Sequence, residues 1–433
     1  MQTTALARLP VLVAGVRTAF LDSAGAYADL MSYQLAAHSI AALVQRYIAD
    51  PQDIELVTMG TVLHEVNTTN VARESMLAAG LPSSIPAYTV AMAGISPSVG
   101  LANLCDMIAL GRLQLGIAGG TDNFSDVPIR LSQNIRRTVM KARQNKTLSH
   151  RLKLLSALRL SDLRLELPSS SDFTTQLSMG QACEAMVAQH AVSREACDAF
   201  AAQSHARAIA ATAAQYYQTQ IAPMQIGGQS VRQDNTARAD ATIERLAQLK
   251  PVFDPQGVIT AGNASRFSDG AGALLVSSWA KAEHLGLPLG AVMRDYQWVG
   301  VQDLRHEMLL GPALSIPRLL QRNQLSFEDI AVWEIHEAFA AQLLVNLKCL
   351  ASQQFVAQRF GQGYPYGQIP SDRLNLWGGS LALGNPFAAT GIRLFQTAIQ
   401  RLKHANQRYA VVSTCAGGGL GAAYLLENTD YIR

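Results

Sequence analysis

TVAMAGISPSVGLANLCDMIALGRLQLGIAGG, residues 89–120, combines the signals of a helix with those of the strand that follows it. Ser96 is a candidate N-cap, Pro97 suits the first helical position, and Gly111 suits the position just beyond the helix end. Four apolar side chains recur between them at helical spacing: Leu101, Leu104, Cys105 and Ile108. The pattern predicts a helix over 97–110. Residues 115–120 then predict a strand that ends in a glycine turn.

Strand and helix patterns alternate on both sides of this stretch. We expect strands at 10–16, 54–62, 374–376 and 410–413, helices at 26–48 and 386–402, and an alanine-rich helical region at 180–218. This alternation predicts an α/β fold. Residues 375–402 repeat the order of strand, small-residue turn and helix found at 89–111. Two similar halves facing each other would place both turns at one central site, although the identity between the units is too low to prove a duplication.

Composition bounds the class of protein. Hydrophobic residues make up 49% of the 433 residues and charged residues 15%, which excludes a disordered chain and indicates a large buried core. At roughly 150 residues per domain the length predicts two or three domains. The net charge of +3 without a basic motif does not favour a nucleic-acid partner. No apolar run approaches the roughly 18 residues of a membrane span.

Cysteine usage and the N-terminus both favour the cytoplasm. The five cysteines lack CxxC or Cys/His metal spacing, so we expect reduced thiols and no metal site. Residues 9–16 form a short apolar run without a convincing cleavage pattern. A first strand is therefore a better interpretation of this run than a secretion signal.

Basic residues and leucines are interleaved between positions 136 and 164. The basic residues are Arg136, Arg137, Lys141, Arg143, Lys146, Arg151, Lys153, Arg159 and Arg164. The pattern predicts an inserted helical excursion, which ends near residues 168–171. A solvated cationic face explains it as well as a functional surface does. The functional alternatives are contact with an anionic CoA nucleotide, a partner subunit or anionic lipid.

Three C-terminal segments carry the most specific signals. They are 262–265 with 269–272, then 336–340 (HEAFA), and then 378–386 (GGSLALGNP) with 415–419 (CAGGG). In this order and spacing they closely resemble the thiolase family. Earlier segments agree with the resemblance: 16–18 (VRT), 118–122 (AGGTD) and 179–180 (MG). The branch that the chain resembles most is the 3-ketoacyl-CoA thiolase β-subunit of fatty-acid oxidation complexes, and the resemblance runs essentially end to end.

The resemblance implies a thiolase fold, in which two pseudo-symmetric halves form a five-layered αβαβα arrangement. It divides the chain into an N-terminal half (1–128 plus 249–279), an inserted loop domain (129–248) and a C-terminal half (280–433). It also implies acyl-CoA:acetyl-CoA C-acyl transfer, with CoA or acyl-CoA as substrate and no covalently bound cofactor. Family members are dimers or dimers of dimers, and a hydratase/dehydrogenase α-subunit is a further partner implied by resemblance.

The family chemistry assigns roles to several positions of this sequence. A nucleophilic cysteine at a helix N-terminus attacks the thioester carbonyl, and a second cysteine moves a proton. By resemblance Cys415 is that second cysteine, and His336 faces the site and helps to stabilise an oxyanion. The implied CoA-binding positions are Met179, Ser265 and Phe339, together with Gly417, whose backbone can approach a ligand closely.

Two positions depart from the family pattern. Gly94 stands where the nucleophilic cysteine is expected, and Asn385 stands where the motif GHP has its histidine. Glycine cannot form an acyl-enzyme, and asparagine can donate a hydrogen bond but cannot act as a base near neutral pH. The flanking residues Ala91, Met92, Ile95, Ser96 and Pro97 also depart from the usual pattern, so we interpret the change as natural divergence.

Three hypotheses follow from this combination. The first is a diverged thiolase-like protein that binds CoA thioesters without orthodox thiolysis. The second is an enzyme with altered acyl-transfer or hydrolytic chemistry that uses Cys415 and His336. The third is a non-catalytic partner or membrane-associated subunit that makes contact through 136–164. For Cys415 the alternative to an active-site role is a small core thiol, and for His336 it is a satisfied core histidine. The other four cysteines are expected to be structural.

Overall fold

The N-terminal half of the molecule is built on five neighbouring strands. The computed structural model describes residues 6–169 and 171–432. In sheet order the five strands are β4 (Ala87–Val90), β3 (Leu56–Gly60), β5 (Leu115–Asp122), β10 (Ser268–Ser278) and β1 (Pro10–Arg17). β3 runs parallel to β4 and β5, whereas β10 runs antiparallel to β5 and β1. The short strand β2 (Leu21–Asp22) pairs with β10.

The C-terminal half repeats this pattern of parallel and antiparallel pairing. Its strands are β12 (Ile330–Ile335), β13 (Tyr409–Ala416), β14 (Leu420–Asn428) and β11 (Ala291–Gly300). β12 runs parallel to β13, and β14 runs antiparallel to β13 and β11. The predicted strand at 374–376 is present only as a parallel bridge between Leu374 and Trp333. This bridge lies where β4 lies in the first half, so the two halves are alike in strand order.

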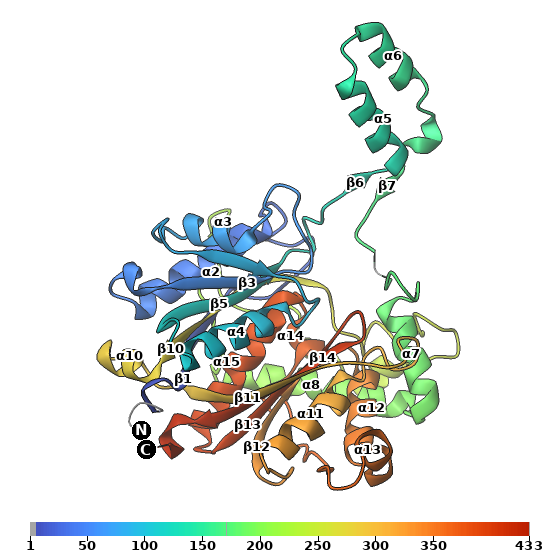
Figure 1. Cartoon of the computed structure of the whole chain (residues 1–433). Helices are drawn as coiled ribbons and strands as arrows, with labels where there is room; N and C mark the ends of the chain where they lie inside the picture. Colours follow the sequence, from blue (N-terminus) through green and yellow to red (C-terminus); the bar gives the residue numbers. More distant parts are fainter. Residues whose placement is uncertain (1–5, 170, 433) are drawn as a thin grey trace.

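The two sets of strands meet edge to edge and carry helices on both faces. Pairing of β1 with β11 at Val11 and Leu12 joins them into a ten-stranded sheet within the described residues. Helices α4 (Ser96–Ala109) and α15 (Ala388–His404) lie between the two halves, and α15 contacts both β5 and β13. Helices α2 (Ser32–Tyr47) and α3 (Val71–Ala78) cover one outer side. On the other outer side lie α11 (Gly311–Arg322) and α12 (Ala340–Leu350) (Figure 1). These layers form the expected αβαβα order.

Glycine allows the central helix to come close to the first half. A Cβ on Gly120 in β5 would collide with the carbonyl of Ala388, the first residue of α15. α15 is buried on nearly all sides, which is typical of a helix packed between two sheets. The site described below lies where this helix begins.

Helix boundaries correct several details of the sequence prediction. Ser96 is the first residue of α4 rather than its N-cap, and its hydroxyl accepts a hydrogen bond from the Met92 N–H at 2.7 Å. Gly111 follows the helix with φ of +70°, as predicted. The predicted helix at 26–48 begins only at Ser32. The helical region predicted at 180–218 is two helices, α7 (Met179–His190) and α8 (Arg194–Ala213), because Ala191 adopts a left-handed conformation.

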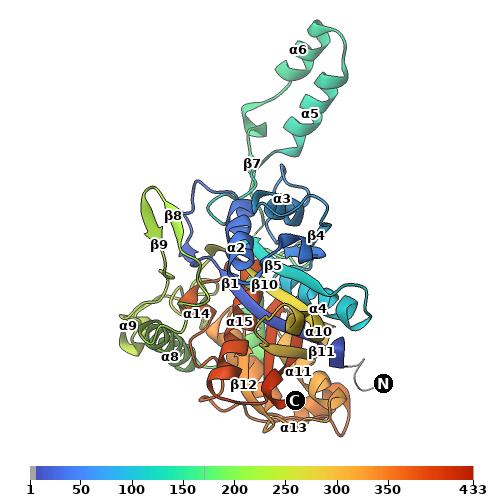
Figure 2. The same ribbon diagram turned by 90° about the vertical axis from the view of Figure 1, so that its left-hand side faces the viewer.

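Within the segment predicted as an insertion, 129–248, one part projects from the molecule and another packs against the rest of the fold. Strands β6 (Arg130–Leu131) and β7 (Leu165–Glu166) pair at the base of an arm that carries α5 (Gln133–Gln144) and α6 (Leu148–Ser156). This arm projects away from the rest of the molecule (Figures 1 and 2). In contrast, α7 and α8 pack against α12. Arg17 in β1 forms a buried ion pair with Asp234 at 2.6 Å, which ties the later part of the segment to the N-terminal half.

The remaining elements are short. They are β8 (Met224–Ile226), β9 (Gln229–Val231), α9 (Ile243–Ala247), α10 (Trp279–His284), α13 (Gln353–Phe360) and α14 (Ser380–Leu383). Single 3₁₀ turns occur at Pro51–Asp53, Leu160–Asp162 and Thr429–Tyr431. Across the described ranges, no helix is both long and apolar enough to cross a membrane.

Candidate functional site

Loops from both halves bring the predicted site residues together at the centre of the molecule. A Cβ built on Gly94, in the turn between β4 and α4, would lie 3.8 Å from the Ala416 Cβ. One built on Gly417 would lie 3.6 Å from the Met179 Sδ at the start of α7. The loop after β12 joins this group because the His336 N–H donates to the Ser413 carbonyl at 2.9 Å. Residues far apart in the sequence therefore form one site.

Gly94 leaves open space at the start of α4. Apart from its chain neighbours, the Ala416 Cβ is the one described heavy atom that an added Cβ would meet within 4 Å. The backbone φ of Gly94 is not positive, so a side chain would cause no strain there. The turn is instead fixed by Ser96, whose hydroxyl contacts the backbone of Met92 and Ala93. Glycine is therefore not required by the conformation of this turn.

Cys415 is a buried thiol near the end of β13, where it lies opposite Gly421 of β14. Its side chain is almost inaccessible, with 4% of the residue surface exposed. Burial raises the pKa of Cys415 to about 12 because the thiolate would lose its hydration. The thiol is therefore protonated at neutral pH. All five cysteines are free and buried, in agreement with the prediction of unpaired thiols.

His336 lies directly after β12 and is held by its ring as well as by its backbone. Its Nδ1 lies 2.9 Å from the Ser380 Oγ at the start of α14. Burial, helped by the positive charge of Arg393, lowers the pKa of His336 to about 3. The imidazole is therefore neutral at physiological pH.

Glu337 supports this loop from the interior. Its carboxylate accepts hydrogen bonds from the Ser204 hydroxyl at 2.7 Å, the Asn375 amide at 2.6 Å and the Leu381 N–H at 3.2 Å. The side chain is buried, which raises its pKa. With three donors directed at it, Glu337 connects the His336 loop to α8 and to α14.

Asn385 is fixed by partners on both sides of its amide. Its Nδ2 donates to the Ser265 Oγ at 3.3 Å, and its Oδ1 accepts from the Thr390 hydroxyl at 2.9 Å. The Ser265 N–H in turn donates to the Ala338 carbonyl at 2.9 Å. Ser265 therefore links Asn385 to the loop that carries His336. Phe339, which ends this loop, pairs through its backbone with Ala264.

Asp122 connects the two halves immediately beneath the site. Its carboxylate accepts from the N–H groups of Leu63 at 2.8 Å, Val62 at 3.0 Å and Ala388 at 2.9 Å. Burial raises its pKa to about 6. A carboxyl group that accepts from the first residue of α15 also complements the positive end of that helix. Asp122 therefore sets where the central helix begins.

Sequence reasoning missed the supporting residues Ser380, Thr390, Arg393 and Asp122. Ser380 and Asp122 both lie inside motifs quoted above, but their partners are 44 and 266 residues away in the sequence. No spacing rule links such pairs. The residues predicted from the motifs do converge, while those that orient them become visible only in the fold.

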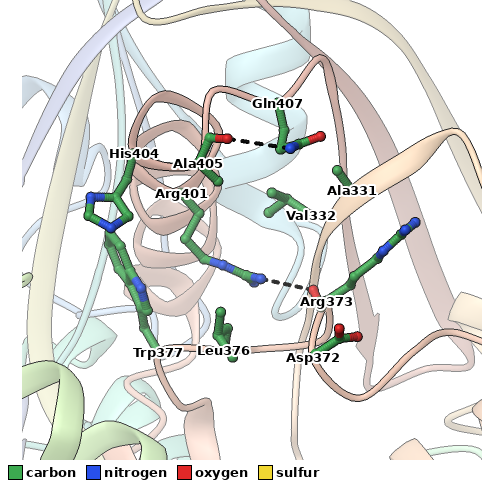
Figure 3. A pocket seen from close by; sticks show the side chains of 10 residues that line it. All are labelled: Ala331, Val332, Asp372, Arg373, Leu376, Trp377, Arg401, His404, Ala405 and Gln407. Atoms are coloured by element: carbon green, nitrogen blue, oxygen red, sulfur yellow. Dashed lines mark hydrogen bonds between the residues drawn. The ribbon is translucent and has the colours of Figure 1, made fainter.

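A cavity of about 230 Å³ with a mixed polar and apolar lining lies elsewhere, between the start of β12 and the end of α15 (Figure 3). Its lining includes Arg401, whose guanidinium donates to the Glu334 carboxylate at 2.6 Å and to the Arg373 carbonyl at 2.9 Å. None of the predicted site residues lines it. Since Arg401 is already bound to protein groups, this cavity does not replace the central site. In the described part of the chain, no cluster of three or more His, Cys, Asp or Glu side chains could hold a metal ion.

The fold is that of the thiolases, and comparison with family models shows that the chain belongs to the thiolase family. Residues 10–280 match the family "Thiolase, N-terminal domain", and residues 287–428 match "Thiolase, C-terminal domain". The family is that of the acyl-CoA acyltransferases implied by the sequence motifs.

Two curated relatives and one solved structure are similar to this chain over nearly its whole length. The mitochondrial trifunctional enzyme subunit beta of Mus musculus is 40% identical over 96% of this chain and 88% of its own length. A probable 3-ketoacyl-CoA thiolase of Caenorhabditis elegans is 39% identical over 96% of this chain and 93% of its own. The crystal structure of human mitochondrial 3-ketoacyl-CoA thiolase in complex with CoA superposes with a TM-score of 0.82, at 29% identity, covering 98% of this chain and 99% of that one.

Proposed function

We propose that this chain binds CoA thioesters at the central site and does not perform cysteine-based thiolysis. The observation that carries the proposal is the open space at Gly94, bordered by Ala416 of the β13 end. The fold and the converging motif residues supply a place for the thioester, while the position of the expected nucleophile has no side chain. The family reaction of acyl-CoA:acetyl-CoA C-acyl transfer is therefore replaced by binding.

The states of Cys415 and Asn385 support binding of the thioester rather than an altered acyl-transfer or hydrolytic reaction. Cys415 is protonated because burial raises its pKa to about 12, so it is a poor nucleophile. Asn385 cannot take up a proton near neutral pH. Altered acyl-transfer or hydrolytic chemistry through Cys415 and His336 would need a base beside the thiol, and no hydrogen bond joins these two side chains in the described structure.

Calorimetric titration with acetyl-CoA, acetoacetyl-CoA and octanoyl-CoA tests the proposal. We expect at least one of them to bind the unaltered chain. The variant Gly94→Leu would fill the open space and weaken that binding by about 10-fold or more. Gly300→Leu is the matched control, because Gly300 also has open space and no positive φ. Absence of binding by all three thioesters, or equal binding by both variants, would overturn the proposal.

The projecting arm favours a second function, peripheral contact with an anionic membrane. On α6 the side chains of Leu148, Leu152 and Leu155 are 69%, 58% and 42% exposed. Basic side chains lie on the same arm, including Arg151 and Lys153. Exposed leucines beside cationic groups are the combination that inserts into the headgroup region of anionic lipid.

Flotation with phosphatidylserine vesicles tests this second function. Binding should fall as salt is raised, because the cationic part of the attraction is screened. It should be lost in the variant Leu152→Asp/Leu155→Asp and kept in Leu77→Asp/Leu110→Asp, which alters exposed leucines elsewhere. Binding that is equal in both variants would refute the role of the arm. Binding of a hydratase/dehydrogenase subunit in place of vesicles would assign the arm to a partner subunit.

The proposal also covers the oligomeric state of the protein and its location in the cell. We propose a homodimer or a dimer of dimers in the cytoplasm, which the five free thiols support. The related trifunctional enzyme subunits carry the name "beta", which supports an α-subunit with hydratase and dehydrogenase activities as a partner of this chain as well. Light scattering after size-exclusion chromatography would test assembly, and a monomer would contradict it.

A further inference from the structure

Two buried side chains form a line behind the imidazole of His336. The Arg393 Nη2 donates to the Ser380 Oγ at 2.9 Å, and the same oxygen lies 2.9 Å from the His336 Nδ1. Ser380 and Arg393 have no exposed surface. The arrangement spans two helices, since Ser380 begins α14 and Arg393 lies in α15.

The chemistry of the three groups fixes where their protons lie. A guanidinium can only donate, so the Ser380 oxygen accepts from Arg393. Within the described residues the Ser380 hydroxyl has one other hydrogen-bond partner, the His336 Nδ1. The hydroxyl hydrogen is therefore directed at Nδ1, which must be the unprotonated nitrogen. A neutral imidazole then carries its proton on Nε2.

The opposite nitrogen of the ring is free for a ligand. Among the described residues, no hydrogen bond to the His336 Nε2 is formed, and the residue keeps 7% of its surface exposed. The His336 loop continues through Ala338 to Ser265 and Asn385 of the central site. A donor at Nε2 would therefore point away from the buried Ser380 side of the ring.

We propose that Ser380 and Arg393 are positioning residues that hold His336 as the Nε2–H tautomer, so that it donates a hydrogen bond to the carbonyl oxygen of a bound thioester. The ligand part of this inference rests on the proposed binding of CoA thioesters. The tautomer itself is a property of the free protein and can be measured without ligand.

The charge of Arg393 adds to this effect. Its Nε and Nη1 are buried and have no protein partner among the described residues. An incompletely compensated guanidinium close to the ring disfavours an imidazolium ion, in keeping with the pKa of His336, lowered to about 3 by burial and by Arg393. A neutral donor at Nε2 keeps its proton over the whole physiological pH range.

Nitrogen-15 NMR of histidine-labelled protein tests the tautomer. The His336 signals are assigned by their loss in His336→Asn. We expect a one-bond proton coupling on Nε2 and none on Nδ1 in the unaltered chain. Ser380→Ala should raise the fraction of the Nδ1–H form, whereas Ser315→Ala, which removes an equally buried hydroxyl from α11, should not. An Nδ1–H tautomer in the unaltered chain would overturn the proposal even if a variant failed to fold.

A pair of ligands tests the hydrogen bond to the carbonyl. Octanoyl-CoA and its thioether analogue S-octyl-CoA differ in the carbonyl oxygen, so the ratio of their affinities isolates that contact. Ser380→Ala should reduce the preference for the thioester by about fivefold, the value of one ordinary hydrogen bond, and Ser315→Ala should leave it unchanged. An unchanged ratio in Ser380→Ala would refute the carbonyl contact. If neither ligand bound, both the proposed function and the hydrogen bond from His336 to the carbonyl would be refuted. The NMR measurement would still show which tautomer of His336 is present.

Discussion

The two halves of the molecule contribute to the central site in opposite ways. The N-terminal half brings the turn at Gly94, which offers open space and no side-chain chemistry. The C-terminal half brings His336 and Asn385. The His336 ring is held by a hydrogen bond with Ser380, and the Asn385 amide donates to Ser265 and accepts from Thr390. Yet both halves have the same strand order and each places a helix in the central layer.

This difference between the halves shows that the fold fixes side-chain geometry only on the C-terminal side of the site. Buried polar groups are costly unless they are satisfied, so a network with partners at each step gives the C-terminal side a defined geometry. An open position at a helix start imposes no such demand. Under the proposed function, the C-terminal side of the site orients the thioester through this network, and the N-terminal side supplies no nucleophile because Gly94 has no side chain.

The largest expected effect concerns the reactivity of Cys415 on the rigid side. With a pKa of about 12, its thiolate fraction at pH 8 is about 10⁻⁴, so alkylation by iodoacetamide should be on the order of 10³-fold slower than for an unperturbed cysteine. Mass spectrometry of the peptide that contains Cys415 measures the rate, with the urea-unfolded chain as control. Rapid labelling of the folded chain would show that the site activates this thiol.

The next effect concerns Glu337, which supports the polar side. Glu337→Ala leaves three donors without their acceptor, and the free energy of unfolding should fall by about 3 kcal/mol or more. Glu337→Gln keeps one acceptor oxygen and should cost less. Urea denaturation gives both values, and Glu74→Ala on the surface of α3 is the control. A loss below about 1 kcal/mol would show that this network does not specify the loop.

The pH dependence of stability tests the neutral state of His336. Its folded-state pKa of about 3 lies below the unfolded value of about 6.5. As the pH falls below about 6.5, the unfolded chain therefore binds the proton first, and stability is lost by up to about 1.4 kcal/mol per pH unit. His336→Asn should flatten this slope between about pH 6 and 4, whereas substitution of the exposed His64 by Asn should not. An unchanged slope in His336→Asn would refute the assigned protonation state.

The smallest effect is expected on the open side. Gly94→Ala should change the free energy of unfolding by less than about 1 kcal/mol, because the new methyl group has room and the backbone conformation suits alanine. Gly120→Ala is the matched comparison, since its Cβ would collide with the Ala388 carbonyl and should cost more. Thermal unfolding of both variants tests the contrast. Equal losses would mean that Gly94 is also packed tightly.

Local signals in the sequence predicted much of the fold. The helix predicted at 97–110 is observed at Ser96–Ala109, because proline at its start and Gly111 after its end act within a few residues. The prediction that Ser96 is the N-cap was wrong. Its hydroxyl accepts a hydrogen bond from the turn before the helix, and the capping preference of serine does not predict this contact. The helix predicted from residue 26 begins at Ser32, since apolar spacing continues through the turn before it.

The site was predicted as a set of residues but not as a network. Motifs brought Gly94, His336, Asn385 and Cys415 into one hypothesis. The structure places Gly94, His336 and Asn385 in loops that meet at the centre, beside the end of β13 that carries Cys415. The bonds that orient them join residues from different elements, such as Ser380 of α14 with His336 after β12. Such partners depend on how sheets and helices pack, so no spacing within one segment could reveal them.

The central claim is that the site keeps its thioester-binding geometry and lacks covalent thiolase chemistry. The most direct test is a thiolysis assay with 3-ketoacyl-CoAs of several chain lengths, on the unaltered chain and on Gly94→Cys/Asn385→His in parallel. We expect no thiolysis by the unaltered chain and measurable thiolysis by the double variant, because the cysteine side chain fits the open space at position 94. Thiolysis by the unaltered chain would contradict this claim, because it would show that the site performs thiolase chemistry without a cysteine at position 94.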